Sequence, residues 1–384
     1  MLIYLVAGEP SGDMLGARLM QAMRKIAPET EFAGVGGENM EKEGLTSLFD
    51  ITDLAVMGLA EVIPSIPKVL RHIKETVNDI AEKKPDVVVT IDSWSFSERV
   101  HKALRKKGIK VLQMHYVAPQ VWAWKKGRAK TMYKYIDRLL TLFPNEPAYF
   151  TPYHLEADCV GHPVIENPLI SGELQVSGNI DTKDKRLILI LPGSRHNEVE
   201  KLLPTFVDAT KELDKKYKNL RYVLPTVKTV EKRVERILTE KNVKNIRILH
   251  SREEKGEAML KATAAIAASG TISLELAIMK IPHIIAYKVA PLTAWLARHL
   301  LKIKSVNLPN ILLDERVVPE LLQEDCNAEK IADTIGAYLD IEAVREEFNH
   351  KMDKLCQVMG VGELKPSEKA AQIIFAAIRD KNKA

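Results

Sequence analysis

Cysteine is scarce in this sequence. The 384 residues include three cysteines, Cys159, Cys326 and Cys356, and they lie too far apart for metal-ligand spacing. A sparse, odd count argues against a disulfide framework and indicates a reducing compartment. We therefore expect neither cross-links nor a metal centre built from cysteine.

Long apolar runs and a large charge excess are also missing. No apolar stretch approaches the roughly 20 residues that a membrane-spanning helix needs. The N-terminal MLIYLVAGEP lacks the basic residues of a signal peptide and predicts a buried strand instead. The net charge of +5 is small for this length and argues against a dedicated nucleic-acid binder. These absences predict a cytoplasmic globular protein that could still lie on a membrane surface.

The sequence is rich in apolar strands that alternate with amphipathic helices, which is typical of a parallel sheet covered on both faces. The expected strands are 2–7, 32–37, 85–92, 110–117 and 137–144 in the first half, and 187–193, 222–226, 246–250, 264–270 and 281–288 in the second.

A break in this alternation indicates a domain boundary. Residues 164–185 are rich in Pro, Gly, Ser, Asn and Asp and show no strong period. We therefore expect an α/β fold of two Rossmann-like domains facing a cleft, 1–165 and 166–354. A C-terminal segment, about 355–384, is expected to pack back on the first domain.

Two turns in the second half are suited to binding a nucleotide. In LILILPGSRHNEVE, Gly193 lets the backbone approach a ligand, and Ser194 and Arg195 precede a predicted helix whose first N–H groups are free for a diphosphate. In ASGTISLELAI, the turn 269–271 likewise leads from a strand into a helix.

The second turn, Ser269-Gly270-Thr271, is followed by Glu275 one helical turn later, and this carboxylate could accept both ribose hydroxyls. Thr271 and Glu275 could equally cap and charge a helix start. Neither turn is GxGxxG and there is no Walker lysine, which argues against NAD and ATP.

Acidic residues follow two of the first-domain strands. The loop GEPSGD places Glu9, Ser11, Gly12 and Asp13 after the first strand, and Asp92 ends the third. An acid at the carboxyl end of a strand is a candidate general base. Asp13 also suits a helix start for structural reasons alone.

Two further stretches leave several interpretations open. HYVAPQVWAWKKGRAK (115–130) carries His115 and Trp122 among basic residues, so it could line a sugar site, rest on lipid, stack on nucleic acid or form a half-buried aromatic pair. The segment 59–77 carries an apolar stripe that faces a core more often than a membrane. Its members include Ile63, Ile66, Val69, Leu70 and Ile73.

Together these motifs resemble the lipid-A-disaccharide synthases, a family of bacterial GT-B glycosyltransferases. The resemblance runs nearly end to end and rests on specific strings in the family's order: AGEPSGDMLG, LAVMGLAEV, HYVAPQVWAWKKGR, VGHPV, LPGSRHNEVE, ASGTISLE, PLTAWLARHLLK, SVNLPNIL and VPELLQ.

The resemblance implies a reaction and its participants. A 2,3-diacylglucosamine would pass from UDP to the 6-hydroxyl of 2,3-diacylglucosamine 1-phosphate (lipid X) with inversion, giving the β-1,6 disaccharide 1-phosphate and UDP. It implies no cofactor, because an arginine and helix N-termini can stabilise departing UDP without a metal. The residues matched to family positions are Asp92 as the base, together with Glu9, Ser11, Asp13, Arg195, Glu275 and Asn310.

One motif departs from the family. Where many members read IDxPDFN, this chain reads IDSWSFS, so that Trp94 replaces proline and Ser95 and Ser97 replace the aspartate and asparagine. We expect His115 to orient Asp92 in place of the lost acid, and Trp94 to sit on the acceptor side. If the lost acid was itself the base, the assignment of Asp92 is wrong.

The resemblance also bears on partners. Acylated substrates favour binding of the 59–77 stripe to the inner-membrane surface, with no nucleic acid, and the family implies a homodimer, one form of which exchanges C-terminal segments. Two alternatives remain: a UDP-GlcNAc epimerase or soluble-acceptor transferase of the same fold, and an RNA-binding protein that uses 115–138.

Overall fold

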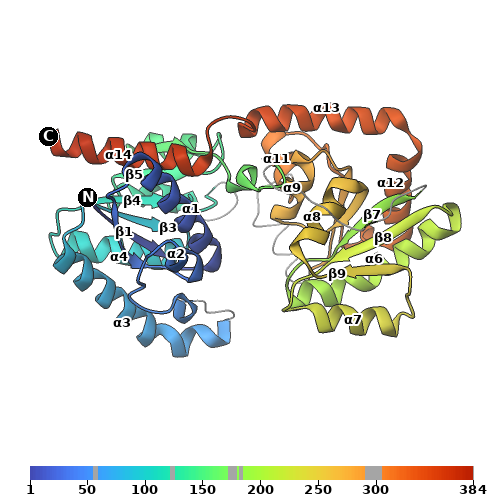
Figure 1. Cartoon of the computed structure of the whole chain (residues 1–384), viewed down its shortest axis with the longest axis horizontal. Helices are drawn as coiled ribbons and strands as arrows, with labels where there is room; N and C mark the ends of the chain where they lie inside the picture. The colour runs from blue at the N-terminus through green and yellow to red at the C-terminus, as the bar shows by residue number, and fades with distance from the viewer. Residues whose placement is uncertain (55–58, 122–125, 172–179, 181–184, 290–304, 384) are drawn as a thin grey trace. The chain divides into compact units, whose positions relative to one another are not determined.

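The computed structural model describes residues 1–54, 59–121, 126–171, 180, 185–289 and 305–383. The chain forms two compact units (Figure 1). Unit 1 comprises Met1–Pro163 and Glu363–Ala384, and unit 2 comprises Val164–Gly362. The division lies two residues before the boundary expected at 165, and the returning segment begins at Glu363 rather than near 355.

Unit 1 is built on a six-stranded parallel sheet in the order β2-β1-β3-β4-β5-β6. Its elements are β1 (Leu2–Ala7), α1 (Pro10–Ile26), β2 (Glu31–Val35), α2 (Glu38–Lys42), α3 (Leu59–Lys83), β3 (Val87–Ile91), α4 (Trp94–Lys106), β4 (Leu112–Tyr116), α5 (Ala129–Met132), β5 (Arg138–Thr141), β6 (Glu156–Cys159) and α14 (Pro366–Lys383).

Helices cover both faces of this sheet. Alternate strand residues such as Leu5 and Val89 pack with α1 and α14 on one face. The intervening residues, such as Tyr4 and Val88, pack with α3 and α4 on the other. The continuous apolar runs in the sequence follow from this double coverage.

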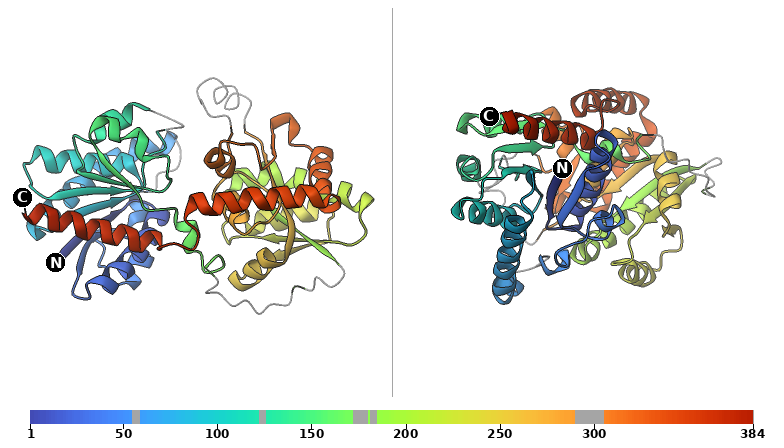
Figure 2. Two further views of the ribbon diagram at one scale, coloured as in Figure 1. Left: turned by 90° about the horizontal axis from the view of Figure 1, so that it is seen from above. Right: turned by 60° about the vertical axis from the view of Figure 1, so that its left-hand side comes forward.

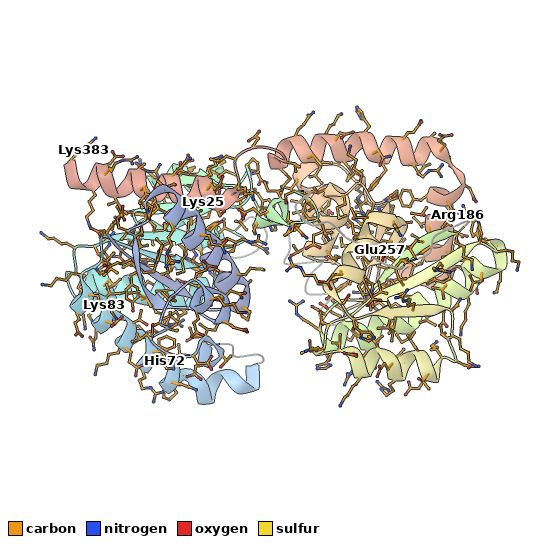
Figure 3. All side chains as sticks on the ribbon, viewed as in Figure 1. Lys25, His72, Lys83, Arg186, Glu257 and Lys383 are labelled. Carbon is orange, nitrogen blue, oxygen red and sulfur yellow. The ribbon has the colours of Figure 1, made fainter. Side chains whose placement is uncertain are left out.

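The last helix, α14, packs on α1 of the same unit and lies across it in Figure 2. Ile374 and Ile378, one helical turn apart, are buried with Leu19 of α1. Lys25, labelled in Figure 3, pairs with Glu368 at 3.1 Å. The homodimer and the exchange of this segment between two chains stay predictions.

Unit 2 repeats the architecture with a parallel sheet in the order β12-β11-β10-β7-β8-β9. Its elements are β7 (Arg186–Leu191), α6 (His196–Lys216), β8 (Leu220–Pro225), α7 (Glu231–Glu240), β9 (Ile246–Leu249), α8 (Arg252–Lys261), β10 (Ala262–Ala267), α9 (Thr271–Ile278), β11 (His283–Tyr287), α11 (Leu308–Leu313), β12 (Glu320–Leu322), α12 (Ala328–Asp340) and α13 (Glu342–Met359).

The fold class of two Rossmann-like domains is confirmed, and all ten expected strands are present within a few residues. The edge strands β6 and β12 were not predicted, because they have four and three residues and are at most half-buried. The helix α1 begins at Pro10, inside the expected loop, where the fixed φ of proline suits a first helical position. The helix α3 runs through both of its prolines.

Candidate functional site

The first candidate site lies at the carboxyl edge of the unit 1 sheet, between β1 and β3. The next two strands in the chain, β2 and β3, pair with opposite edges of β1. Ala7 is opposite Ile91, so the residues that follow them, Gly8 and Asp92, emerge side by side. Ligands of open α/β sheets bind at such a topological switch point.

Asp92 and Ser93 form a strained elbow between β3 and α4. Their φ angles of 55° and 44° are left-handed, a conformation that non-glycine residues keep only where neighbours enforce it, often at functional sites. The Asp92 N–H donates to the Tyr116 carbonyl at 2.9 Å, and the Ser97 hydroxyl donates to the Asp92 carbonyl at 3.0 Å. An added Cβ at Gly8 would lie 2.7 Å from the Ser93 Cβ, so this close approach requires glycine.

Two carboxyl groups meet at this elbow. Asp92 accepts hydrogen bonds from the Ser93 N–H at 2.8 Å and from the Ser11 hydroxyl at 3.2 Å. Partial desolvation and the charge of Asp92 raise the pKa of Glu9, and a hydrogen bond from Ser93 opposes that rise. The structure therefore brings together Glu9, Ser11 and Asp92, three of the candidate residues from the sequence.

Asp13 has a different role from the one predicted. Its buried carboxylate accepts the N–H groups of Gly37 and Met40 on one oxygen, at 2.7 and 3.0 Å. The other oxygen accepts the backbone and side-chain amides of Asn39 at 3.0 and 2.8 Å. Asp13 thus anchors the start of α2, and its assignment to the acceptor loop is corrected. Gly12 lies against β3, where an added Cβ would be 3.1 Å from a backbone carbonyl.

His115 and Trp94 also differ from expectation. His115 is fully buried in β4, where its Nδ1 lies 2.7 Å from the Thr90 hydroxyl and burial holds its pKa well below the usual value. In the described part of the chain it makes no hydrogen bond to Asp92. Trp94 is 6% exposed and packs edge-on against His115 at 4.7 Å between ring centroids. The predicted roles of His115 as orienter and Trp94 as acceptor contact are both wrong.

The three substituted residues of the departing motif lie in different environments. Ser97, in place of the family's asparagine, holds the carbonyl of Asp92, while Ser95 is exposed. Trp94 fills a core cluster that includes Val121, Met132 and Phe150. Trp122 lies outside the described residues.

The second candidate site lies at the equivalent edge of the unit 2 sheet, between β7 and β10. These strands are neighbours, and the Ala268 N–H donates to the Leu191 carbonyl at 2.8 Å. Since β8 and β10 flank β7, this is again a switch point. The turns 192–195 and 269–271, which the sequence singled out, therefore lie side by side.

Both turns end in helix N-termini that suit an anion. Gly193 and Gly270 have φ of 103° and 140°, which favour glycine. Among the described residues, no hydrogen-bond partner is found for the N–H groups of Ser194, His196 or Thr271. Free N–H groups and the positive ends of helices such as α6 and α9 are features that can bind phosphate.

Charged side chains complete this edge. The Arg195 side chain is 74% exposed and pairs with Glu198 at 2.8 Å, so most of its donors face solvent. Glu275 is half-buried; burial raises its pKa, and the positive charge of Lys255 opposes this. The Ser269 hydroxyl is less available to bind a ligand, because it donates to the Val306 carbonyl at 3.0 Å.

Asn310 is not a direct ligand of this site. Its side chain is 2% exposed, and its Oδ1 accepts the N–H groups of Val317 and Val318 at 2.9 and 2.8 Å. Its Nδ2 donates to the Val318 carbonyl at 2.8 Å and to Glu320 at 3.3 Å. Asn310 clamps the segment between α11 and β12, which corrects its predicted contact with UDP.

The sequence reasoning missed three residues near these edges: Ser93, Glu198 and Tyr287. Glu198 could have been found, because an acid three residues after a helix N-cap is a recognised capping position. Tyr287 carries no local signal, since its contact with Glu198 joins residues 89 positions apart. Ser93 is recognisable only from its left-handed backbone and its contacts with Gly8 and Glu9.

The apolar stripe of α3 divides between two environments. Ile73 is 8% exposed and belongs to the core, and Val69 is half-buried against that core. The predicted membrane contact of these two residues is therefore corrected. Ile66 and Leu70, one helical turn apart, are 47% and 55% exposed. The Ile63 side chain lies outside the described residues.

The described residues include neither a membrane-spanning helix nor a metal-binding cluster. No helix there is long and apolar enough to cross a membrane. No group of three or more His, Cys, Asp or Glu side chains in the same residues could hold a metal ion.

Solved structures share this fold. The UDP-GlcNAc 2-epimerase of Neisseria meningitidis bound to UDP-GlcNAc is 13% identical, with a TM-score of 0.64 over 99% of this chain and 100% of that chain. A spinosyn rhamnosyltransferase complexed with thymidine diphosphate is 11% identical, with a TM-score of 0.58 over 97% of this chain and 100% of the other. At such identities the likeness concerns the fold alone.

Similarity in sequence is far stronger. Residues 3–374 match the family described as lipid-A-disaccharide synthetase. The lipid-A-disaccharide synthase of Paramagnetospirillum magneticum is 45% identical over 99% of this chain and 98% of its own length. That of Rhodospirillum centenum is 41% identical over 98% of this chain and 95% of its own length. The chain therefore belongs to the lipid-A-disaccharide synthetase family.

Proposed function

We propose that this protein is an inverting glycosyltransferase of lipid A biosynthesis. It transfers 2,3-diacylglucosamine from UDP-2,3-diacylglucosamine to the 6-hydroxyl of 2,3-diacylglucosamine 1-phosphate (lipid X). The products are the β-1,6-linked disaccharide 1-phosphate and UDP. Family membership over nearly the whole chain carries this proposal, and the residues at the two switch points fit it.

Unit 2 binds the donor in this proposal. The diphosphate lies at the N-termini of α6 and α9, where Arg195 and free N–H groups offset its charge. Glu275 accepts the ribose hydroxyls, and Lys255 favours the ionised form of that carboxyl. The same groups stabilise the charge that develops on departing UDP, so the reaction needs no metal ion.

Unit 1 activates the acceptor. The Asp92 carboxylate takes the proton of the acceptor's 6-hydroxyl while the oxygen of that hydroxyl bonds to C1 of the donor sugar. The bond from C1 to the phosphate oxygen breaks, and its electron pair leaves with UDP. Ser11 and the Ser93 N–H hold Asp92 in place. Glu9, whose pKa is raised, provides a neighbouring carboxyl that can take up a proton.

The deciding experiment measures product formation from UDP-2,3-diacylglucosamine and lipid X in detergent with EDTA present. We expect disaccharide 1-phosphate and UDP in equal amounts. UDP without disaccharide would overturn the acceptor assignment. Epimerised UDP-GlcNAc in a detergent-free assay would favour the epimerase alternative. RNA binding would leave Arg195 and Glu275 without a role, and it would appear as steeply salt-dependent affinity.

Access to acylated substrates requires contact with a membrane, and we propose that α3 makes it at the cytoplasmic surface of the inner membrane. Ile66 and Leu70 expose apolar surface; Lys68 lies between them in sequence, and Arg71 and Lys74 follow. Two exposed apolar side chains with basic neighbours favour reversible, salt-sensitive attachment to anionic lipid.

Replacing both Ile66 and Leu70 with serine is expected to lower binding to vesicles containing anionic lipid at least tenfold. Each large apolar side chain contributes about 1.5–3 kcal/mol when fully buried, and tenfold corresponds to about 1.4 kcal/mol. Vesicle co-sedimentation measures this binding. The matched control, Leu260→Ser with Ile341→Ser, removes similarly exposed residues of unit 2 and should bind like the wild type. Equal binding by both double variants would exclude α3 as the contact.

A further inference from the structure

The end of β11 is connected to the start of α6 by a side-chain contact that crosses the unit 2 sheet. Tyr287 is the last residue of β11, and β10 separates that strand from β7. Its hydroxyl donates to Oε1 of Glu198 at 3.3 Å. Burial, followed by the charge of Glu198, raises the pKa of Tyr287, so the hydroxyl stays a donor.

Glu198 in turn touches the turn 192–195 in three ways. Its Oε1 accepts the guanidinium of Arg195 at 2.8 Å, and its Oε2 lies 3.4 Å from the Arg195 backbone nitrogen. An added Cβ at Gly193 would lie 2.3 Å from Oε2, so the carboxylate rests directly against the backbone of the turn. The Glu198 side chain is 10% exposed, in contrast to the exposed arginine that it holds.

This arrangement matters because an exposed arginine is costly to order. A free Arg195 side chain would sample many rotamers and lose that freedom whenever it bound phosphate. A carboxylate that fixes one edge of the guanidinium, and is itself fixed by a tyrosine, places the remaining donors in advance of binding. Such preorganisation favours ligands that reach Arg195 and leaves others unaffected.

We propose that Tyr287 and Glu198 are positioning residues for diphosphate recognition: Tyr287 braces Glu198, which holds Arg195 and the turn 192–195 in the conformation that binds the diphosphate of the donor. This inference rests on the proposed binding of UDP by unit 2. It assigns a function to Tyr287, a residue from outside the two turns.

The test compares Tyr287→Phe with the wild type in calorimetric titrations with UDP and, by displacement, with uridine. We expect the Kd for UDP to rise three- to tenfold and the Kd for uridine to stay unchanged, since uridine has no phosphate for Arg195. Tyr222→Phe is the matched control. Tyr222 lies in the same sheet, and its hydroxyl donates to Asp214 of the same helix at 2.9 Å. Asp214 lies toward the end of α6 that is far from the turn 192–195.

A second measurement repeats the substitution in an Arg195→Met background. Because Arg195 is one of the two parts that the brace holds, Tyr287→Phe should there raise the Kd for UDP less than in the wild type, and a double-mutant cycle reports this coupling. An undiminished loss in that background would overturn the inference, as would equal losses for UDP and uridine or wild-type affinity in Tyr287→Phe. Failure of the wild-type protein to bind UDP is a distinct result, and it would overturn the proposed function together with the inference.

Discussion

Replacing Asp92 with asparagine is expected to lower kcat by about 10²- to 10⁴-fold, the usual contribution of a general base. Asparagine keeps the shape of the side chain. Its oxygen can still accept the Ser93 N–H while its amide nitrogen donates to the Ser11 hydroxyl, but it cannot take the proton of the 6-hydroxyl. Because no group of UDP itself is assigned to Asp92 in the proposed reaction, the affinity for UDP should be unchanged. Initial rates of disaccharide formation and calorimetry with UDP measure the two quantities separately.

The other end of the same strand provides a matched control. Asp86 lies just before β3 and accepts the Leu2 N–H at 2.8 Å, so Asp86→Asn changes an acid of unit 1 far from the elbow. We expect near-normal turnover from this control. Normal turnover in Asp92→Asn would remove Asp92 from the mechanism, and Glu9 would then be the next candidate base because it meets Asp92 at the same edge.

Replacing Arg195 with methionine is expected to weaken UDP binding about 10- to 100-fold. A hydrogen bond to a charged group contributes roughly 1.5–3 kcal/mol, and each 1.4 kcal/mol is about tenfold in Kd. The effect should disappear for uridine, which has no phosphate. Methionine keeps much of the apolar stem, and the exposed position makes a large loss of fold stability unexpected. Calorimetry with both ligands and thermal unfolding check these outcomes.

Arg236→Met is the control for charge and ion pairing. Arg236 lies on α7 and pairs with Glu200 of α6 and with Glu240, so its removal costs unit 2 two ion pairs away from the turn 192–195. UDP affinity should match the wild type. A loss as large as that of Arg195→Met would mean that net charge, rather than a specific contact, governs nucleotide binding.

Strand order explains why the candidate sites could be predicted as far as they were. Apolar runs indicate parallel strands, and loops after parallel strands meet at one edge of a sheet. Glu9 and Asp92 therefore converge although 83 residues separate them in the numbering, and so do the turns around Gly193 and Gly270. The short edge strands β6 and β12 escaped prediction because a few half-buried residues carry too little periodicity.

The sequence by itself determined the two Rossmann-like domains, the edge of each sheet at which the candidate site residues lie, and the family. Which polar side chains remain free at those edges was decided only by the tertiary structure. The Asp13 carboxylate binds the N–H groups at the start of α2, and Asn310 binds the backbone of the segment before β12. Trp94 packs in a core formed largely from residues beyond β4. Tyr287 acquires a role through Glu198 in the same way. A buried polar group must find hydrogen-bond partners wherever the fold places them, and those partners lie at sequence distances that no local pattern records.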